Sequence, residues 1–349
     1  MPKVRIKDIA EIANVSIGTV DRVIHNREGV SLSTREKVRQ LLAEYDYTPD
    51  IVASSLALKR EIHLAAVMPQ VVNEHAFWKL PQKGIRRAMD QFAHYGITTD
   101  VFYFDQFSKA DFKRKISDFP YESVHGVLFA PVFMGESVAF LSKCEKAGIP
   151  VILFNSNLRE PAVKSFVGQD AFHSGYVAAK LINYGIEPKR DVAIIKMSGR
   201  KDYYTHISSR EEGFRTYFEE HSDRLSHLIS IDMNGEDNVK LKQKLEEVYN
   251  GYDIAGLFVT NSRVYKVAEF LAEKGAMNVR LVGYDLLPES IEFLKRDYID
   301  FLISQRPEEQ AFLGLTSLFN LVAFNRVPEE QQLLPIDIIT RENLVYYKL

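Results

Sequence analysis

Residues 61–349 alternate between compact apolar runs and segments whose apolar residues recur at helical spacing. The run IHLAAVM at 62–68 precedes GIRRAMDQFAHYG, and the same order continues as far as VRLVGYD at 279–285. Alternation of strands and helices implies parallel sheets joined by right-handed crossovers. Two such series follow one another, so the sequence predicts an α/β domain of two lobes, with a ligand cleft at the carboxyl ends of the strands.

The N-terminal residues 6–26 show another pattern, that of two short helices with a tight turn between them. Each helix has an apolar stripe at helical spacing: Ile9, Ala10 and Ala13 in the first, and Val20, Val23 and Ile24 in the second. Asn14 stands at the join, where a left-handed backbone is expected, and Ser16 is the expected N-cap of the second helix. Such a pair either packs as ordinary core or, as a helix-turn-helix, presents the opposite face of its second helix to the DNA major groove.

A third helix and a short helical segment should follow. Ser33 and Glu36 have the spacing of a capping box, and the third helix should end before Thr48-Pro49, because proline excludes the helical conformation at the residue before it. Residues 50–60 can form a helix but are too few for one that is stable alone in water. We therefore expect this segment to fold only against a partner copy and DNA.

From Ile6 to Ala57 the chain resembles the N-terminal module of the lactose-repressor (LacI/GalR) family, through KDIAEIANVS, GTVDRVIHN, VSLSTREKVRQLLAEYDYTPD and IVASSLA. The resemblance implies an all-α helix-turn-helix DNA-binding domain at 1–48, a hinge helix at 49–60, and a two-lobed effector-binding and dimerisation domain at 61–349. It also implies that a homodimer binds a palindromic operator in double-stranded DNA, with Leu56 wedged into the minor groove. The DNA-contacting residues expected are Ser16, Ile17, Gly18, Thr19, Asp21, Arg22, His25, Asn26, Ala53, Leu56 and Ala57.

The module departs from the family pattern in the turn and in the second helix. Asn14 stands where the family usually has glycine, and asparagine tolerates the left-handed backbone expected there. Asp21 replaces the usual small residue; it either accepts a hydrogen bond from a cytosine amino group or orients Arg22, and both alternatives stay open. Gly18 offers no side chain for reading a base, so specificity should depend more on Ile17, Asp21 and DNA shape.

Residues 61–349 resemble the ribose-binding-protein-like sensor of the same family, most specifically in LVGYDLLPESIEFLK and FLISQRPEEQAFLGL. The resemblance implies a periplasmic-binding-protein-like fold whose lobes close on a small sugar or related metabolite. A sugar needs an apolar platform for its C–H face and polar groups for its hydroxyls. The effector-binding residues expected are Phe77, Trp78, Asn155, Asn157, Arg210, Asn261, Asp285 and Gln305.

Two pairs in this set have an alternative role. Asn155 and Asn157 follow a predicted strand, where asparagine is also common in caps and turns, and they replace the acidic residue that is more usual in the family. Phe77 and Trp78 follow the first strand, where they either form the sugar platform or pack in the core of a lobe. Asp170 is expected to be an N-cap rather than a ligand group.

Signatures of enzymes are missing from the sequence, which has no GxGxxG after a strand, no P-loop, no HExxH and no GxSxG. The nine histidines show no pairing at metal-ligand spacing, so we expect neither a metal nor a cofactor. The single cysteine, Cys144, fits a reducing compartment. With no apolar signal segment and no apolar run of about 18 residues, the expected location is the cytoplasm, without a membrane partner.

The charge distribution gives weak support to DNA binding. Residues 1–60 carry ten Lys or Arg against eight Asp or Glu, although the whole chain has a net charge of −3. So small a positive excess fits a phosphate-facing module better if two copies act together. The function expected is a ligand-responsive, sequence-specific transcription regulator, in the first instance a repressor, of carbohydrate-utilisation genes. The alternatives are a solute-binding protein and a sugar-metabolising enzyme, in which the N-terminal helices would not read DNA.

Overall fold

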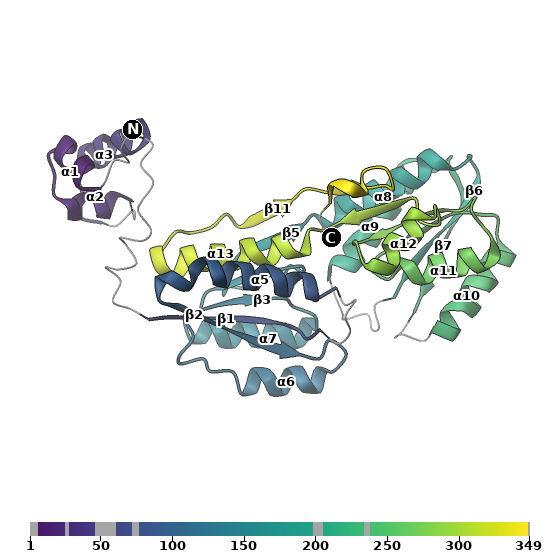
Figure 1. Cartoon of the computed structure of the whole chain (residues 1–349), viewed down its shortest axis with the longest axis horizontal. Coiled ribbons are helices and arrows are strands. Elements are labelled where there is room, and N and C mark those ends of the chain that lie inside the picture. Colours follow the sequence, from purple (N-terminus) through teal and green to yellow (C-terminus); the bar gives the residue numbers. More distant parts are fainter. Residues whose placement is uncertain are drawn as a thin grey trace.

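The computed structural model describes residues 6–24, 28–45, 61–71, 77–197, 205–233 and 238–347. Figure 1 shows a helical module at the start of the chain, followed by sheets that are covered by helices. Within the described ranges, no helix is both long and apolar enough to cross a membrane. The boundary expected between residues 48 and 49 lies outside these ranges, and the limits of the three expected domains stay predictions.

The N-terminal module consists of α1 (Ile6–Ala13), α2 (Ile17–Ile24) and α3 (Leu32–Glu44). The apolar stripes of α1 and α2 meet in its core, together with Val38 of α3. Asn14 has the expected left-handed backbone, with φ of 57°. Ser16 Oγ accepts a hydrogen bond from the Thr19 N–H at 3.1 Å, which confirms the expected cap of α2.

The expected start of the third helix was wrong by two residues. The capping oxygen belongs to Ser31, whose Oγ accepts from the Thr34 N–H at 3.3 Å, and α3 therefore begins at Leu32. Ser33 lies inside the helix instead of capping it. Both serines precede a run of helix-forming residues, so sequence spacing alone does not distinguish them.

The first lobe, here called the N-lobe, is built on a six-stranded sheet with the order β11-β5-β4-β3-β1-β2, in which the pairings are parallel. Its strands are β1 (Ile62–Pro69), β2 (Ile97–Phe104), β3 (Gly126–Phe129), β4 (Val151–Phe154), β5 (Val163–Gln169) and β11 (Gln331–Leu334). The helices α5 (Lys79–Phe92) and α13 (Pro307–Phe324) cover one face, and α6 (Lys109–Ser117) and α7 (Met134–Lys146) cover the other. Burial on both faces explains why the central strands are continuous apolar runs.

The second lobe, here called the C-lobe, has the strand order β12-β10-β9-β8-β6-β7. Its strands are β6 (Arg190–Lys196), β7 (Leu225–Asp232), β8 (Ile254–Val259), β9 (Arg280–Tyr284), β10 (Phe301–Ser304) and β12 (Asp337–Ile339). The helices α8 (Ala171–Gly185) and α9 (Thr205–Glu220) cover one face, and α10 (Asn238–Gly251), α11 (Val264–Lys274) and α12 (Pro288–Lys295) cover the other. The predicted α/β class is confirmed, but β12 pairs antiparallel with β10, so this sheet is parallel except at that edge.

The two predicted series of strands and helices do not account for the end of the chain. After β10 the chain returns to the N-lobe, where α13 packs beside α5 and β11 pairs with β5. The two helices approach closely at Gly84, where an added Cβ would lie 2.0 Å from the carbonyl oxygen of Glu308. Figure 1 shows α13 and α5 side by side on the N-lobe sheet.

Candidate functional site

One face of α2 projects away from the core of the N-terminal module. Of the residues expected to contact DNA, Ser16, Ile17, Gly18 and Arg22 are exposed, and Thr19 and Asp21 are half-buried. Ile17 keeps 48% of its surface exposed although it is apolar. An exposed aliphatic side chain and an exposed arginine on one helix suit DNA base edges, because the thymine methyl is apolar and guanine offers two acceptors.

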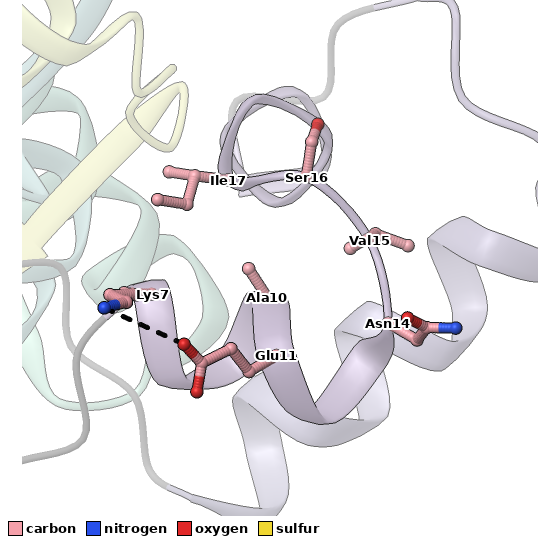
Figure 2. Close-up of a pocket in the computed structure, with 7 residues that line it drawn as sticks. All are labelled: Lys7, Ala10, Glu11, Asn14, Val15, Ser16 and Ile17. Atoms are coloured by element: carbon pink, nitrogen blue, oxygen red, sulfur yellow. Dashed lines mark ion pairs between the residues drawn. The ribbon is translucent and has the colours of Figure 1, made fainter.

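A groove of about 600 Å³ runs between α1 and α2. Figure 2 shows Lys7 and Glu11 of α1 on one side of it, and Ser16 and Ile17 at the start of α2 on the other. Lys7 Nζ lies 3.8 Å from Glu11 Oε1, and both side chains are largely exposed. An ion pair in water contributes little to stability, so a DNA phosphate could compete with Glu11 for the ammonium group.

Gly18 is not required by the packing of the module. An added Cβ would meet its nearest neighbour, Ser16 Oγ, at 3.7 Å, which is an ordinary van der Waals contact. The glycine therefore leaves space on the outer face of α2 rather than allowing a close approach of two backbones. The remaining DNA-contacting residues expected, His25, Asn26, Ala53, Leu56 and Ala57, lie outside the residues that the structure describes.

In the C-lobe a chain of hydrogen bonds joins three of the expected effector-binding residues. Arg210 of α9 donates from Nη2 to Gln305 Oε1 at 2.6 Å, and Gln305 Nε2 donates to Asp285 Oδ2 at 2.7 Å. Arg210 also donates from Nη1 to the carbonyl oxygen of Thr260 at 2.8 Å. Gln305 and Asp285 directly follow β10 and β9, so the neighbouring strand ends bring them together.

This cluster is buried but not fully satisfied. Arg210 and Asp285 are each 1% exposed, and among the described residues Asp285 Oδ1 and Arg210 Nε have no hydrogen-bond partner. Burial raises the pKa of Asp285 to about 6, against the opposing effect of the Arg210 guanidinium. One acceptor and one donor without partners, in a cluster whose formal charges cancel, are suited to bind the hydroxyl groups of a polar ligand.

The packing of α8 against α9 holds Arg210 in place. An added Cβ at Gly175 of α8 would lie 1.9 Å from the carbonyl oxygen of Arg210, so the two helices can approach this closely only without that side chain. The guanidinium carbon lies 3.6 Å from the ring centroid of Tyr284, a cation–π contact. Tyr284 is held in turn by Ser174, whose hydroxyl lies 2.9 Å from the tyrosine hydroxyl.

Asn155 of the N-lobe is linked to the same cluster through Gln310. Asn155 follows β4 with a left-handed backbone of φ 68°, and its N–H donates to Gln310 Oε1 at 3.0 Å. Gln310 Nε2 donates to the carbonyl oxygen of Gln305 at 2.7 Å. This relay of two hydrogen bonds connects the loop after β4 with the polar cluster of the C-lobe.

A direct contact between the lobes lies nearby. Ser156 Oγ, in the loop after β4, is 2.6 Å from Nδ1 of His206 in the first turn of α9. Burial lowers the pKa of His206 well below its ordinary value, and the neighbouring Arg210 lowers it further. The imidazole is therefore neutral at physiological pH.

The two aromatic residues expected as a sugar platform differ in burial. Trp78 is 3% exposed, packs edge-on against Phe77 and Phe154, and donates from Nε1 to Gln106 Oε1 at 3.0 Å. This environment matches the alternative role of a core residue. Phe77 is half-buried and packs against the same N-lobe core.

Two of the expected asparagines have other surroundings. Asn157 lines a groove of about 360 Å³ at the edge of the N-lobe sheet, together with Leu158 and Gln331. Asn261 donates from Nδ2 to the carbonyl oxygen of Met197 at 3.0 Å, and its Oδ1 accepts from the Arg263 N–H at 3.1 Å. Both ends of the Asn261 amide are thus bonded to main chain, as in a turn.

The sequence interpretation missed Ser156, His206 and Gln310. His206 stands four residues before Arg210, so both lie on one face of a helix, and this spacing could have indicated it. Gln310 offers no such signal, because its role depends on the return of α13 to the N-lobe.

Two family models match successive parts of the chain. Residues 5–50 match the family model described as bacterial regulatory proteins, lacI family, and residues 65–326 match the periplasmic binding protein domain. The HTH-type transcriptional repressor ExuR assigned in Bacillus subtilis (strain 168) is 22% identical, over 98% of both chains. The ribose operon repressor of Halalkalibacterium halodurans is 25% identical over 81% of this chain and 80% of that protein.

Solved structures share the two-lobed fold. A crystal structure from Bacteroides fragilis, of a protein assigned as a LacI transcriptional regulator, has a TM-score of 0.76 with 27% identity, and covers 83% of this chain and 100% of that one. A solute-binding protein of Burkholderia graminis C4D1M in complex with D-arabinose has a TM-score of 0.71 with 19% identity, over 83% of this chain and 99% of that one. At that identity the second likeness shows the fold alone.

Proposed function

Because this chain belongs to the lacI family of bacterial regulatory proteins and carries a periplasmic binding protein domain over most of its length, we propose that it represses sugar-utilisation genes by binding a palindromic operator as a homodimer. The effector is a small sugar bound between the lobes. The proposal gives the chain no catalytic role, and it puts the protein in the cytoplasm, where operator DNA is found.

The observation that carries the effector assignment is the buried cluster of Arg210, Gln305 and Asp285, in which Asp285 Oδ1 and Arg210 Nε have no partner among the described residues. A buried polar atom without a partner costs about 1–3 kcal/mol. A sugar hydroxyl that donates to Asp285 and accepts from Arg210 would remove this cost at both atoms. Ligand binding would thus stabilise the arrangement in which the lobes meet at Ser156 and His206.

The DNA assignment is supported by the exposed face of α2. Arg22 and Ile17 are exposed on this face, and Gly18 between them leaves room for a base edge. An arginine commonly makes two hydrogen bonds to guanine, and an aliphatic side chain contacts the thymine methyl. We therefore propose that each half-site contains a guanine read by Arg22 and a thymine read by Ile17.

A dimer surface is proposed on the side where α5 and α12 meet. A groove of about 730 Å³ lies between them, with apolar walls that include Leu80 and Ile291. Lysines and glutamates both line it, among them Lys83 and Glu292. A two-fold interface needs a surface that is complementary to itself, and a mixture of both charges around apolar walls meets this need.

Selection of operators from a random palindromic DNA library with the full chain tests the DNA proposal. An enriched palindrome with guanine and thymine at symmetric positions is expected, whereas recovery of no palindrome would contradict the DNA proposal.

A thermal-shift panel of pentoses, hexoses, hexuronates and phosphosugars tests the effector proposal. A stabilising sugar should lose its effect in Asp285→Ala, and should retain it in Asp170→Ala, which removes an acid that caps α8.

A further inference from the structure

Three segments of the chain connect the lobes. Residues 169–171 lead from β5 to α8, residues 304–307 lead from β10 to α13, and residues 334–337 lead from β11 to β12. Any rotation of one lobe against the other must change the backbone of these three crossovers. A side chain that holds the crossovers to one another therefore acts on the angle between the lobes.

The side-chain amide of Gln169, on the first crossover, is bonded to the other two crossovers. It stands on the first crossover, at the end of β5, and its Nε2 donates to the carbonyl oxygens of Ser304 and Pro335, both at 3.0 Å. These two carbonyls belong to the second and the third crossover. The side chain is 6% exposed, so water competes little for these hydrogen bonds.

Both N–H groups of the amide are used, and they cannot follow two carbonyls that move apart. A rotation of the lobes that separates the second crossover from the third must stretch or break at least one of the two bonds. The Oε1 atom of Gln169 is buried and has no partner in the part of the chain that the structure describes. An apolar residue of the same size would avoid the cost of burying that oxygen, so the two donated bonds are what distinguishes glutamine here.

A second link joins two of the crossovers at the surface. Arg306 donates to Asp337 from Nε at 2.5 Å and from Nη2 at 3.0 Å, and the arginine side chain is 43% exposed. This pair connects the second crossover to the third but does not reach the first. Ion pairs exposed to water contribute little, so the buried amide of Gln169 has the larger effect on the hinge.

We propose that Gln169 is a positioning residue that sets the resting angle between the lobes, as the pivot through which the three crossovers move together. It acts on the hinge and not on the ligand, because its donors are bonded to main chain. Loss of the amide donors releases the crossovers from one another, and the lobes then sample a wider range of angles. The full-length protein tests this without effector or DNA, so the result does not depend on the proposed function.

Spin labels on the full chain measure the angle directly. Glu122→Cys in the N-lobe and Val239→Cys in the C-lobe are exposed positions for the labels. Burial raises the pKa of Cys144 to about 12, which keeps that native thiol unreactive. Double electron–electron resonance then gives the distribution of distances between the lobes. With Gln169 the distribution of distances should have one narrow peak. In Gln169→Met the fraction of molecules in that peak should fall on the order of tenfold.

A charged variant of Gln169 and a control variant of another glutamine test the role of the amide further. Gln169→Glu puts a carboxylate against two carbonyl oxygens, so it should displace the distribution further than Gln169→Met. Gln332→Met is the control, because Gln332 Nε2 donates to Ser317 Oγ at 2.9 Å within the N-lobe and touches no crossover carbonyl; it should leave the distribution unchanged. If Gln169→Met impairs folding, Gln169→Asn serves instead, since the shorter amide cannot reach both carbonyls. Distributions of the Gln169 variants that superimpose on that of Gln332→Met would overturn the proposal.

Discussion

Ser156 Oγ lies 2.6 Å from His206 Nδ1, and this hydrogen bond joins the N-lobe to the first turn of α9 in the C-lobe. The contact requires the lobes to be close together. It stands near Arg210, four residues further along α9, and its formation is therefore coupled to the arrangement in which the polar cluster is assembled.

Removal of this hydrogen bond should weaken effector binding more than it weakens the fold. Ser156→Ala is expected to lower the affinity for the sugar found in the thermal-shift panel by up to about tenfold, because one hydrogen bond contributes roughly 0.5–1.5 kcal/mol. The measurement is isothermal titration calorimetry. Ser226→Ala is the control, since the Ser226 hydroxyl donates to the carbonyl oxygen of Lys189 inside the C-lobe. Equal affinities for the two variants would argue against a lobe contact that favours closure.

Asp285 should make the stability of the protein depend on pH. Its pKa is about 6 in the folded chain and 3.8 in an ordinary aspartate. The folded state therefore binds the proton more tightly, and stability falls as pH rises from about 4 to about 6. Asp285→Asn lacks this effect, so it should be more stable than the native chain at about pH 7.5, by up to about 3 kcal/mol. Urea unfolding at several pH values measures the difference, which should vanish near pH 4; a difference independent of pH would contradict the assignment.

Substitution by alanine should change the stability of the protein in opposite directions at two glycines. Gly18→Ala places its Cβ in ordinary van der Waals contact with Ser16 Oγ, at 3.7 Å, and should stabilise the N-terminal module by up to about 1 kcal/mol, because alanine favours helix. Gly84→Ala puts a Cβ 2.0 Å from the Glu308 carbonyl oxygen, so it should destabilise the N-lobe by at least about 1–3 kcal/mol. Calorimetric Tm values compare the two variants. A loss of stability in Gly18→Ala would show that the packing needs this glycine after all.

Arg22 should account for a large part of operator recognition. Arg22→Ala is expected to weaken binding to the selected operator by about 1–3 kcal/mol and to relax the preference at the guanine it reads. Fluorescence anisotropy with operators carrying each base at that position measures both effects. Lys146→Ala, which removes an exposed positive charge at the end of α7, should change neither. If the two variants bound alike, the face of α2 would not be the reading surface.

The groove between α5 and α12 should control the oligomeric state. Leu80→Glu adds a charge to its apolar wall at a half-buried position and should shift the protein from dimer to monomer in analytical ultracentrifugation, with a loss of operator affinity. Met277→Glu changes an apolar residue elsewhere on the C-lobe that is 54% exposed, and it should remain a dimer. A dimeric Leu80→Glu variant would place the interface on another surface.

Local sequence patterns were sufficient to predict helix faces, helix caps and the alternation of strands and helices. The stripes of α1 and α2, the left-handed Asn14, the caps at Ser16 and Asp170, and the alternation of strands and helices all follow from residues a few positions apart. Hydrophobic periodicity and capping act over one or two helical turns, and a sequence displays them directly. The cap of α3 was misplaced because two serines compete within that same short range.

The sequence by itself determined the two-lobed α/β class and the exposed face of α2, since both depend on periodicity. Only the tertiary structure decided that α13 returns to the N-lobe and that Arg210 meets Gln305, which lies 95 positions further along the chain. The same is true of Gln169, whose bonding partners lie 135 and 166 positions away. Such contacts depend on how the crossovers close the chain, and no local preference specifies which buried amide will face which carbonyl.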